Sequence, residues 1–288
     1  MKTILSVAVV LLAAAIWSPA QSSTQTAGTQ TSGAQAQTPA QNSGGSQQQQ
    51  PADKSAEPKV KAAKTQPEYD AYQAAASQQD VGKAEAAAND FATKFADSDL
   101  RSVLYEQLMR RYQAANNAEK TLEMGRKVLA LDPDSVFALV MVSSVLAERT
   151  SETDVDLAQR REEVVKDSTR AIQLIDTGAF KPAQFTADQL NAIKAMAYAA
   201  QGTVALISKD DPTAEDSLQR ATQLNTLSPE ASVWLRLAIA RDHQKKYADA
   251  LVAANRAVDL SGTEPDVLKL AKQEQTRLKQ LADAKTAH

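Results

Sequence analysis

The feature that most constrains the fold of this chain is a pair of short helical segments within residues 228–260, joined by a turn near Lys245. The first segment carries large apolar residues, Trp234 and Leu237, at helical spacing. The second carries small ones: Ala250, Ala254 and Ala257. Such a two-helix unit cannot bury its apolar face alone, so several units must stack to form a continuous core.

Copies of this unit recur upstream. From Pro67 onward the pattern is helical, with few glycines and no alternation typical of strands. A second copy begins near Leu100, with Tyr105 as a bulky residue, and Leu139 follows it after 34 residues. Thr121 and Gly125 take the places where small residues would let the paired helices approach.

Turn residues mark the helix ends. Asp132-Pro133-Asp134-Ser135 is expected to close one helix and open the next, and Thr186 with Gln189 is expected to form a capping box. Ser228 is expected to cap the last pair, with Pro229 in its first turn. Residues 264–284 are typical of one further helix with a polar face.

These units resemble tetratricopeptide repeats, most clearly over residues 100–147 and 228–262, although Arg241 stands where that family usually has tyrosine. The resemblance implies an all-α fold: an α-solenoid of helix-turn-helix repeats. It implies about five repeats over residues 65–262, closed by a C-terminal capping helix and tail over residues 263–288.

The inner repeats depart from the pattern. In the third copy about nine residues, Arg149–Leu157, precede a helix expected over about 155–175. They either lengthen that helix or form a loop. The fourth copy contains a helix over 193–207 with Gly202 at a small-residue place. The first copy pairs residues 69–76 with 84–95 in a register that the sequence leaves open.

The first twenty residues have the layout of a secretory signal peptide: Lys2, an apolar run Ile4–Trp17, and small residues ending at Ala20. The alternative is an uncleaved membrane anchor, but 14 apolar residues fall short of the ~20 that span a bilayer. The chain has no cysteine that could carry a lipid. We expect an exported bacterial protein, periplasmic or associated with the cell envelope.

Residues 21–64 are expected to form a disordered linker. The segment is rich in Gln, Ser, Thr and Ala and holds too few large apolar residues to offset the entropy of ordering. It is either a tether or a leader without a specific role.

Residues for catalysis, metal binding or cofactor binding are scarce. The chain has two histidines, His243 and the terminal His288, so neither a zinc site nor a Cys–His pair can be assembled. No glycine-rich phosphate loop is present. The net charge of −3 gives no basic face for nucleic acid. We therefore expect no enzyme, no cofactor and no metal.

A partner is expected in the concave groove that the resemblance places along the first helix of each pair. The candidate residues lie between the packing positions: Glu106, Arg110, Gln113, Met141, Ser144, Glu148, Arg236, Ile239 and Asp242. Glu106 and Asp242 would repel a carboxylate, whereas a mixed-charge, partly apolar groove suits a helix or an extended peptide. The sequence thus predicts a non-enzymatic scaffold or adaptor for a protein partner. The alternative is a self-associating structural or assembly component.

Overall fold

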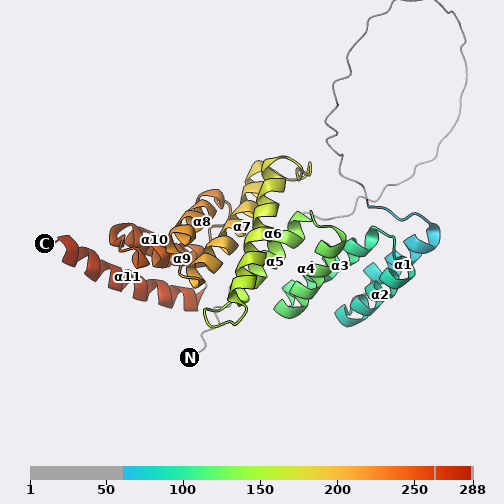
Figure 1. The fold of residues 1–288 in the computed structure, drawn as a ribbon, viewed down its shortest axis with the longest axis horizontal. Coiled ribbons are helices and arrows are strands. Elements are labelled where there is room, and N and C mark those ends of the chain that lie inside the picture. The colour runs from blue at the N-terminus through green and yellow to red at the C-terminus, as the bar shows by residue number, and fades with distance from the viewer. Residues whose placement is uncertain (1–60, 263, 287–288) are drawn as a thin grey trace, which may run out of the picture. The chain divides into compact units, whose positions relative to one another are not determined.

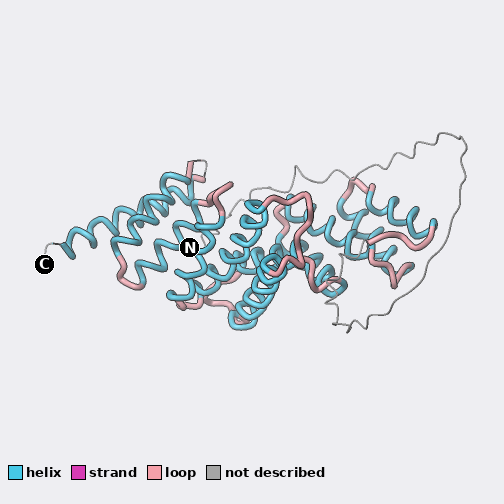
Figure 2. Tube along the Cα trace, turned by 90° about the horizontal axis from the view of Figure 1, so that it is seen from above, coloured by secondary structure: helices cyan, strands magenta, loops and turns pink. Residues whose placement is uncertain are grey.

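The computed structural model describes residues 61–262 and 264–286. Within these ranges the chain forms eleven α-helices and no strand, and Figure 2 shows the loops at the helix ends. None of the described helices combines the length and apolar character needed to cross a membrane. The predicted signal peptide and most of the predicted linker lie outside the described residues, so both stay predictions.

The order of the helices in space follows their order in the chain (Figure 1). Each helix packs against the next, and α1 with α3, α5 with α7, α7 with α9, and α9 with α11 also touch. The bounds are α1 Gln66–Ala76, α2 Val81–Lys94, α3 Leu100–Ala114, α4 Ala118–Leu131, α5 Val136–Arg149, α6 Leu157–Asp176, α7 Ala187–Ile207, α8 Asp211–Leu224, α9 Ala231–His243, α10 Tyr247–Leu260 and α11 Pro265–Thr286. The predicted all-α class, built from paired helices, is confirmed.

Glycines allow close approach within and between pairs. A Cβ at Gly125 of α4 would lie 2.5 Å from Val142 Cγ2 on α5 and 3.2 Å from Met109 Sδ on α3. A Cβ at Gly202 of α7 would lie 2.5 Å from Leu218 Cγ on α8. Both positions were expected to need small residues, and the contacts show why.

Two of the predicted helix ends are confirmed and one is wrong. Thr186 and Gln189 form the capping box that starts α7, and Ser135 caps α5. Ser228 does not cap α9, because that helix begins at Ala231 after Glu230. Instead the Asn225 side chain binds both the N–H and the carbonyl of Ser228, which holds this residue in the preceding turn.

The extra residues of the third copy both form a loop and lengthen the following helix, which were the two alternatives that the sequence left open. Residues 150–156 form a loop after α5, and α6 then runs for 20 residues, compared with 14 in α4. Arg160, near the start of α6, binds Asp156 at 2.8 Å and Asp154 at 3.7 Å. The loop is thereby held to the first turn of the helix.

The last residues assigned to the linker contact the helices. Lys61 Nζ lies 2.6 Å from Asp132 Oδ2, and Lys64 Nζ donates to the Asp97 carbonyl at 2.6 Å. The Lys64 backbone N–H donates to the buried carboxylate of Glu68. Ordered structure thus includes residues 61–64, which composition alone had placed in the linker.

Helix α11 covers the last pair. Val267, Ala271 and Leu278 are buried among residues of α9 and α10. Arg277 forms ion pairs with Asp242 of α9 and with Glu274 of its own helix. This helix lies where the sequence predicted it, over residues 264–284.

Candidate functional site

The predicted residues of α3 meet α5 through a cation–π contact. Glu106, Arg110 and Gln113 follow one another at helical spacing on α3, and all three are partly exposed. Arg110 donates to Glu106 at 2.7 Å, and its guanidinium carbon lies 4.7 Å from the centre of the Phe137 ring on α5. The arrangement places a charged pair against an aromatic ring.

Phe137 belongs to an aromatic cluster that the sequence reading missed. Its ring centre lies 5.5 Å from that of Phe180 and 5.8 Å from that of Phe185, both in the segment between α6 and α7. All three rings are partly exposed. A signal for Phe137 was available, because it lies one helical turn before the predicted Met141.

The predicted residues of α5 continue the same stripe. Met141 packs against the core formed by α1 to α5 while remaining partly exposed. The Ser144 hydroxyl is buried and has no hydrogen-bond partner among the described residues. We use the name first-helix surface for the residues of α3 and α5 that lie together here: Glu106, Arg110, Gln113, Phe137, Met141 and Ser144.

Glu148 and Arg236, predicted separately, bind each other. Arg236 of α9 donates to Glu148 of α5 at 2.7 Å, and the two side chains are 14% and 27% exposed. Because α7 packs against both α5 and α9, this ion pair joins helices on either side of α7. Neither charge is free for a partner while the pair is formed.

The two remaining predicted residues lie near α11. Ile239 packs against a cluster formed by α9, α10 and α11. Asp242 accepts a hydrogen bond from Arg277 of α11, and its side chain is 12% exposed. The structure therefore does not bring these two residues together with the first-helix surface.

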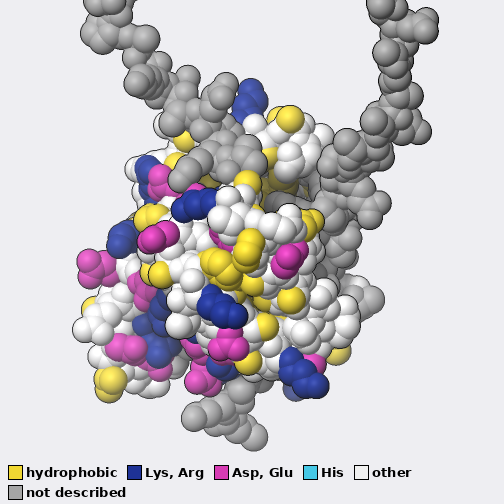
Figure 3. Space-filling model, turned by 90° about the vertical axis from the view of Figure 1, so that its right-hand side faces the viewer, with side chains coloured by type: hydrophobic (Ala, Val, Ile, Leu, Met, Phe, Trp, Pro, Cys, Tyr) yellow, Lys and Arg dark blue, Asp and Glu magenta, His cyan; other side chains and the backbone are white. Residues whose placement is uncertain are grey.

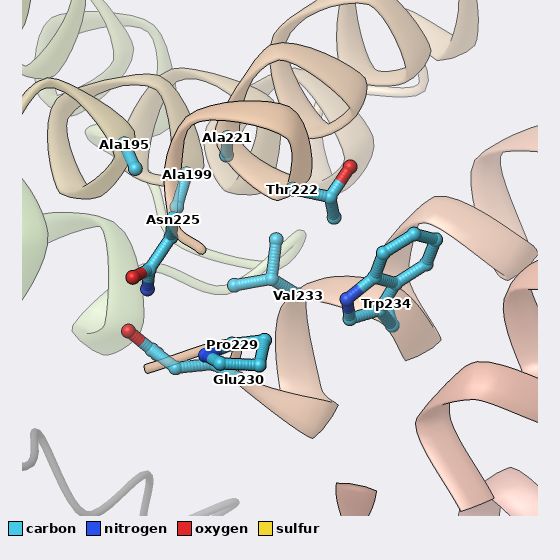
Figure 4. Close-up of a pocket in the computed structure, with 9 residues that line it drawn as sticks. All are labelled: Ala195, Ala199, Ala221, Thr222, Asn225, Pro229, Glu230, Val233 and Trp234. Carbon is cyan, nitrogen blue, oxygen red and sulfur yellow. The ribbon is translucent and has the colours of Figure 1, made fainter. Parts of the chain in front are cut away.

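A small pocket opens between α7, α8 and α9 (Figure 4). It has room for about one water molecule, and the rest of the hollow is open to solvent. Most of its lining is alkyl, and its polar members come from the end of α8 and the start of α9. The lining residues are Ala195, Ala199, Ala221, Thr222, Asn225, Pro229, Glu230, Val233 and Trp234.

Burial raises the pKa of the Glu230 carboxyl above its ordinary value. The neighbouring carboxylates Glu148 and Glu264 act in the same direction, while Arg236 opposes them. Sequence reasoning had placed Trp234 only among the large apolar residues at helical spacing, and it did not connect this residue with Glu230. No local pattern shows that the two line one pocket, because the pocket also needs α7 and α8.

No group of three or more His, Asp or Glu side chains that could hold a metal ion occurs in the described part of the chain. His243 lies at the end of α9, where its Nδ1 is 2.8 Å from Asp211 Oδ1. The imidazole is 46% exposed, so this is a surface contact between α8 and α9.

The sequence matches no protein family profile and no curated protein. Solved structures with a similar arrangement include "Crystal structure of MamA protein", with 15% identity and a TM-score of 0.41, covering 63% of this chain and 86% of that chain. Another is a thermophilic TPR protein of Thermus thermophilus, with 14% identity and a TM-score of 0.42, covering 72% and 98% respectively. In its paired helices the chain is similar to tetratricopeptide-repeat proteins.

Proposed function

We propose that this protein is a non-enzymatic scaffold or adaptor that binds a peptide or protein segment along its first helices. The observation that carries the proposal is the juxtaposition of the Glu106–Arg110 pair with the partly exposed Phe137 cluster. Aromatic and Arg side chains are enriched where proteins bind one another. Met141, one turn from Phe137, extends the apolar part of this surface.

The geometry favours the first-helix surface over the α9 end as the contact region. Arg236, Glu148 and Asp242 are each engaged in intramolecular ion pairs with exposures of 27% or less. The Glu106–Arg110 pair is no freer, with side chains 21% and 30% exposed, so the preference for the first-helix surface rests on the partly exposed aromatic rings beside that pair. The mixed polar and aromatic surface of α3 and α5 suits a helix or an extended segment.

The binding proposal is tested by site-specific photo-crosslinking in cells. We expect a crosslinker at Gln113 or Met141 to capture the same protein. A crosslinker at Val252, which is 63% exposed on α10, serves as the matched control. Capture of the same protein from all three positions, or of none from the first two, would contradict the proposal.

We also propose that the chain acts in the bacterial cell envelope, because its first twenty residues have the layout of a signal peptide. Fractionation with N-terminal sequencing tests this. A periplasmic protein that begins at Gln21 supports export with cleavage. A membrane-bound chain that retains residues 1–20 supports the anchor, and a cytoplasmic chain excludes both.

The second candidate is self-association through the α1 end. Figure 3 shows this end of the molecule, where apolar side chains gather among charged ones. Tyr69 of α1 is 47% exposed, so a large aromatic side chain is available for contact at this end. Sedimentation velocity separates the candidates: a concentration-dependent dimer that Tyr69→Glu abolishes supports self-association, and a monomer at all concentrations removes it.

A further inference from the structure

The ion pair between Glu148 and Arg236 joins two helices that are separated by α7. Glu148 lies in the last turn of α5 and Arg236 in the middle of α9, and their side chains meet at 2.7 Å. Helix α5 packs along α7, whereas the direct contact between α7 and α9 is slight. The pair therefore adds a side-chain link across a junction where α9 makes little contact with α7.

The same junction is incompletely packed and buries polar groups at a cost. The pocket beside Trp234 has room for about one water molecule and opens to solvent. The Trp234 Nε1–H is buried, and no acceptor among the described residues lies within hydrogen-bond distance. Burial also raises the pKa of the Glu230 carboxyl at the start of α9. Both groups would gain hydration if α9 moved away from α7, so the closed arrangement is penalised by their burial.

The bond between Glu148 and Arg236 opposes this penalty. The two side chains are 27% and 14% exposed, so solvent and salt weaken their attraction less than they would weaken that of a fully exposed pair. A hydrogen bond between two charged groups is also stronger than one between neutral groups. Opposing contributions of this kind are the basis of a junction with two arrangements, one closed and one open.

We propose that the Glu148–Arg236 pair is a clasp: it holds α9 closed against α7, and when it breaks, α9 to α11 open locally from α7 and α8. The clasp is a property of the free chain and goes beyond the proposed binding function. Glu148 lies one turn after Ser144, on the same face of α5 as Met141. A segment bound along the first-helix surface would therefore reach the clasp and bias its opening.

The experiment measures hydrogen exchange of the Trp234 indole N–H by ¹H–¹⁵N NMR. This N–H has no protein acceptor among the described residues, so its protection comes from burial, and its exchange rate follows the fraction of open chains. The chain has two tryptophans, and the Trp17→Phe variant identifies the Trp234 signal. The backbone amide of Met109, a fully buried residue of α3, reports unfolding of the whole array.

Glu148→Ala leaves Arg236 without its partner in the closed arrangement, whereas water solvates this arginine in the open one. We expect the indole exchange rate to rise about 10-fold relative to that of the Met109 amide. Asp176→Ala is the matched control, because it removes an ion pair with Lys194 that joins α6 to α7 without reaching α9, and it should leave the indole rate unchanged. Glu148→Arg combined with Arg236→Glu forms the pair in reverse and should return the rate to within about 3-fold of the native value.

Three results would overturn the proposal. The first is an unchanged indole rate in the Glu148→Ala variant. The second is equal acceleration of the indole N–H and the Met109 amide, which would mean that the junction opens only when the whole array unfolds. The third is failure of the reversed pair to restore protection, which would assign the effect to one side chain and not to the ion pair.

If Glu148→Ala fails to fold, Glu148→Gln removes the charge at nearly constant volume, and the same order of exchange rates is expected. All of these measurements use the chain without a partner. A negative result would therefore reject the clasp alone, and the crosslinking experiment would still decide the proposed binding function.

Discussion

At the scale of single residues, the helix pairs depend on positions where no side chain can be accommodated. A methyl group at Gly125 or Gly202 would meet Val142 or Leu218 at 2.5 Å. Alanine favours a helix over glycine by about 1 kcal/mol, but overpacking a core costs about 1–3 kcal/mol. Because both clashes involve branched side chains next to the backbone, we expect the steric cost to exceed the gain in helix propensity.

The prediction is that Gly125→Ala and Gly202→Ala each lower the free energy of unfolding by about 1–2 kcal/mol, measured by urea denaturation. Gly82→Ala on α2 is the control, because its Cβ would meet only Asp80 Oδ1 at 3.4 Å, an ordinary contact. That variant should be neutral or slightly more stable. A stabilised Gly125→Ala variant would show that the helices separate at little cost.

Asp167 of α6 gives a pH-dependent prediction. Burial raises its pKa to about 6, with Glu163 acting in the same direction and Lys166 and Arg126 opposing. The folded state therefore holds this proton when the unfolded chain, with a pKa of about 3.9, has released it. The resulting destabilisation is absent below about pH 4 and fully present above about pH 6.

Replacing Asp167 by Asn removes this titration. We expect Asp167→Asn to be more stable than the native chain by about 1–3 kcal/mol at pH 7.5. The difference should shrink toward zero near pH 4, as followed by urea unfolding across that range. Parallel pH profiles for the two proteins would mean that Asp167 is not held in its protonated form.

At the scale of helices, two glutamates join neighbouring pairs in the same way. Glu85 of α2 accepts from Tyr112 of α3 and from Lys120 of α4, the latter at 2.8 Å. Glu215 of α8 accepts from Arg241 of α9 at 3.1 Å and from Lys246 at 2.5 Å. Arg241 thus bonds α9 to the preceding helix.

Glu215→Gln tests the strength of this connection. Partial burial acts to raise the pKa of Glu215, but the hydrogen bonds from Lys246 and Arg241 outweigh it and lower the pKa. Its stabilisation is therefore present above the unfolded pKa of about 4.3 and is lost as the pH falls through the folded value. We expect Glu215→Gln to lose about 1–3 kcal/mol at pH 7, and the loss to diminish below pH 4. The exposed Glu162→Gln should change stability by less than about 0.5 kcal/mol.

At the scale of the whole molecule, α11 completes the core that the last pair leaves open. Leu278 is fully buried in the cluster that includes Leu237, Ala250 and Ala254. We expect Leu278→Ala to cost about 2–4 kcal/mol, measured by urea unfolding, because it leaves a cavity between α11 and the last pair. Val252→Ala, at an exposed position on α10, should change stability by less than about 0.5 kcal/mol. A small effect of Leu278→Ala would mean that α11 contributes little to the core.

Much of the fold could be predicted from local patterns, because helix periodicity, capping and small-residue places are set by residues close in sequence. The capping box at Thr186 and the close contact at Gly125 are examples. The candidate site was less predictable. Arg110 could be placed on its helix face, but its contact with Phe137 depends on how α3 and α5 both pack against α4.

By itself the sequence determined that this protein is an array of paired helices, since apolar residues at helical spacing and small residues at a period near 34 specify each unit. Only the tertiary structure decided which distant residues meet. Glu148 and Arg236 are 88 residues apart and bind each other across α7. Trp234 and Glu230 line a pocket with residues of α7 and α8. Such contacts depend on the length of α6, the 150–156 loop and the packing of α7. Their effects on helix position add up over several helices, so no single position in the sequence predicts which residues meet.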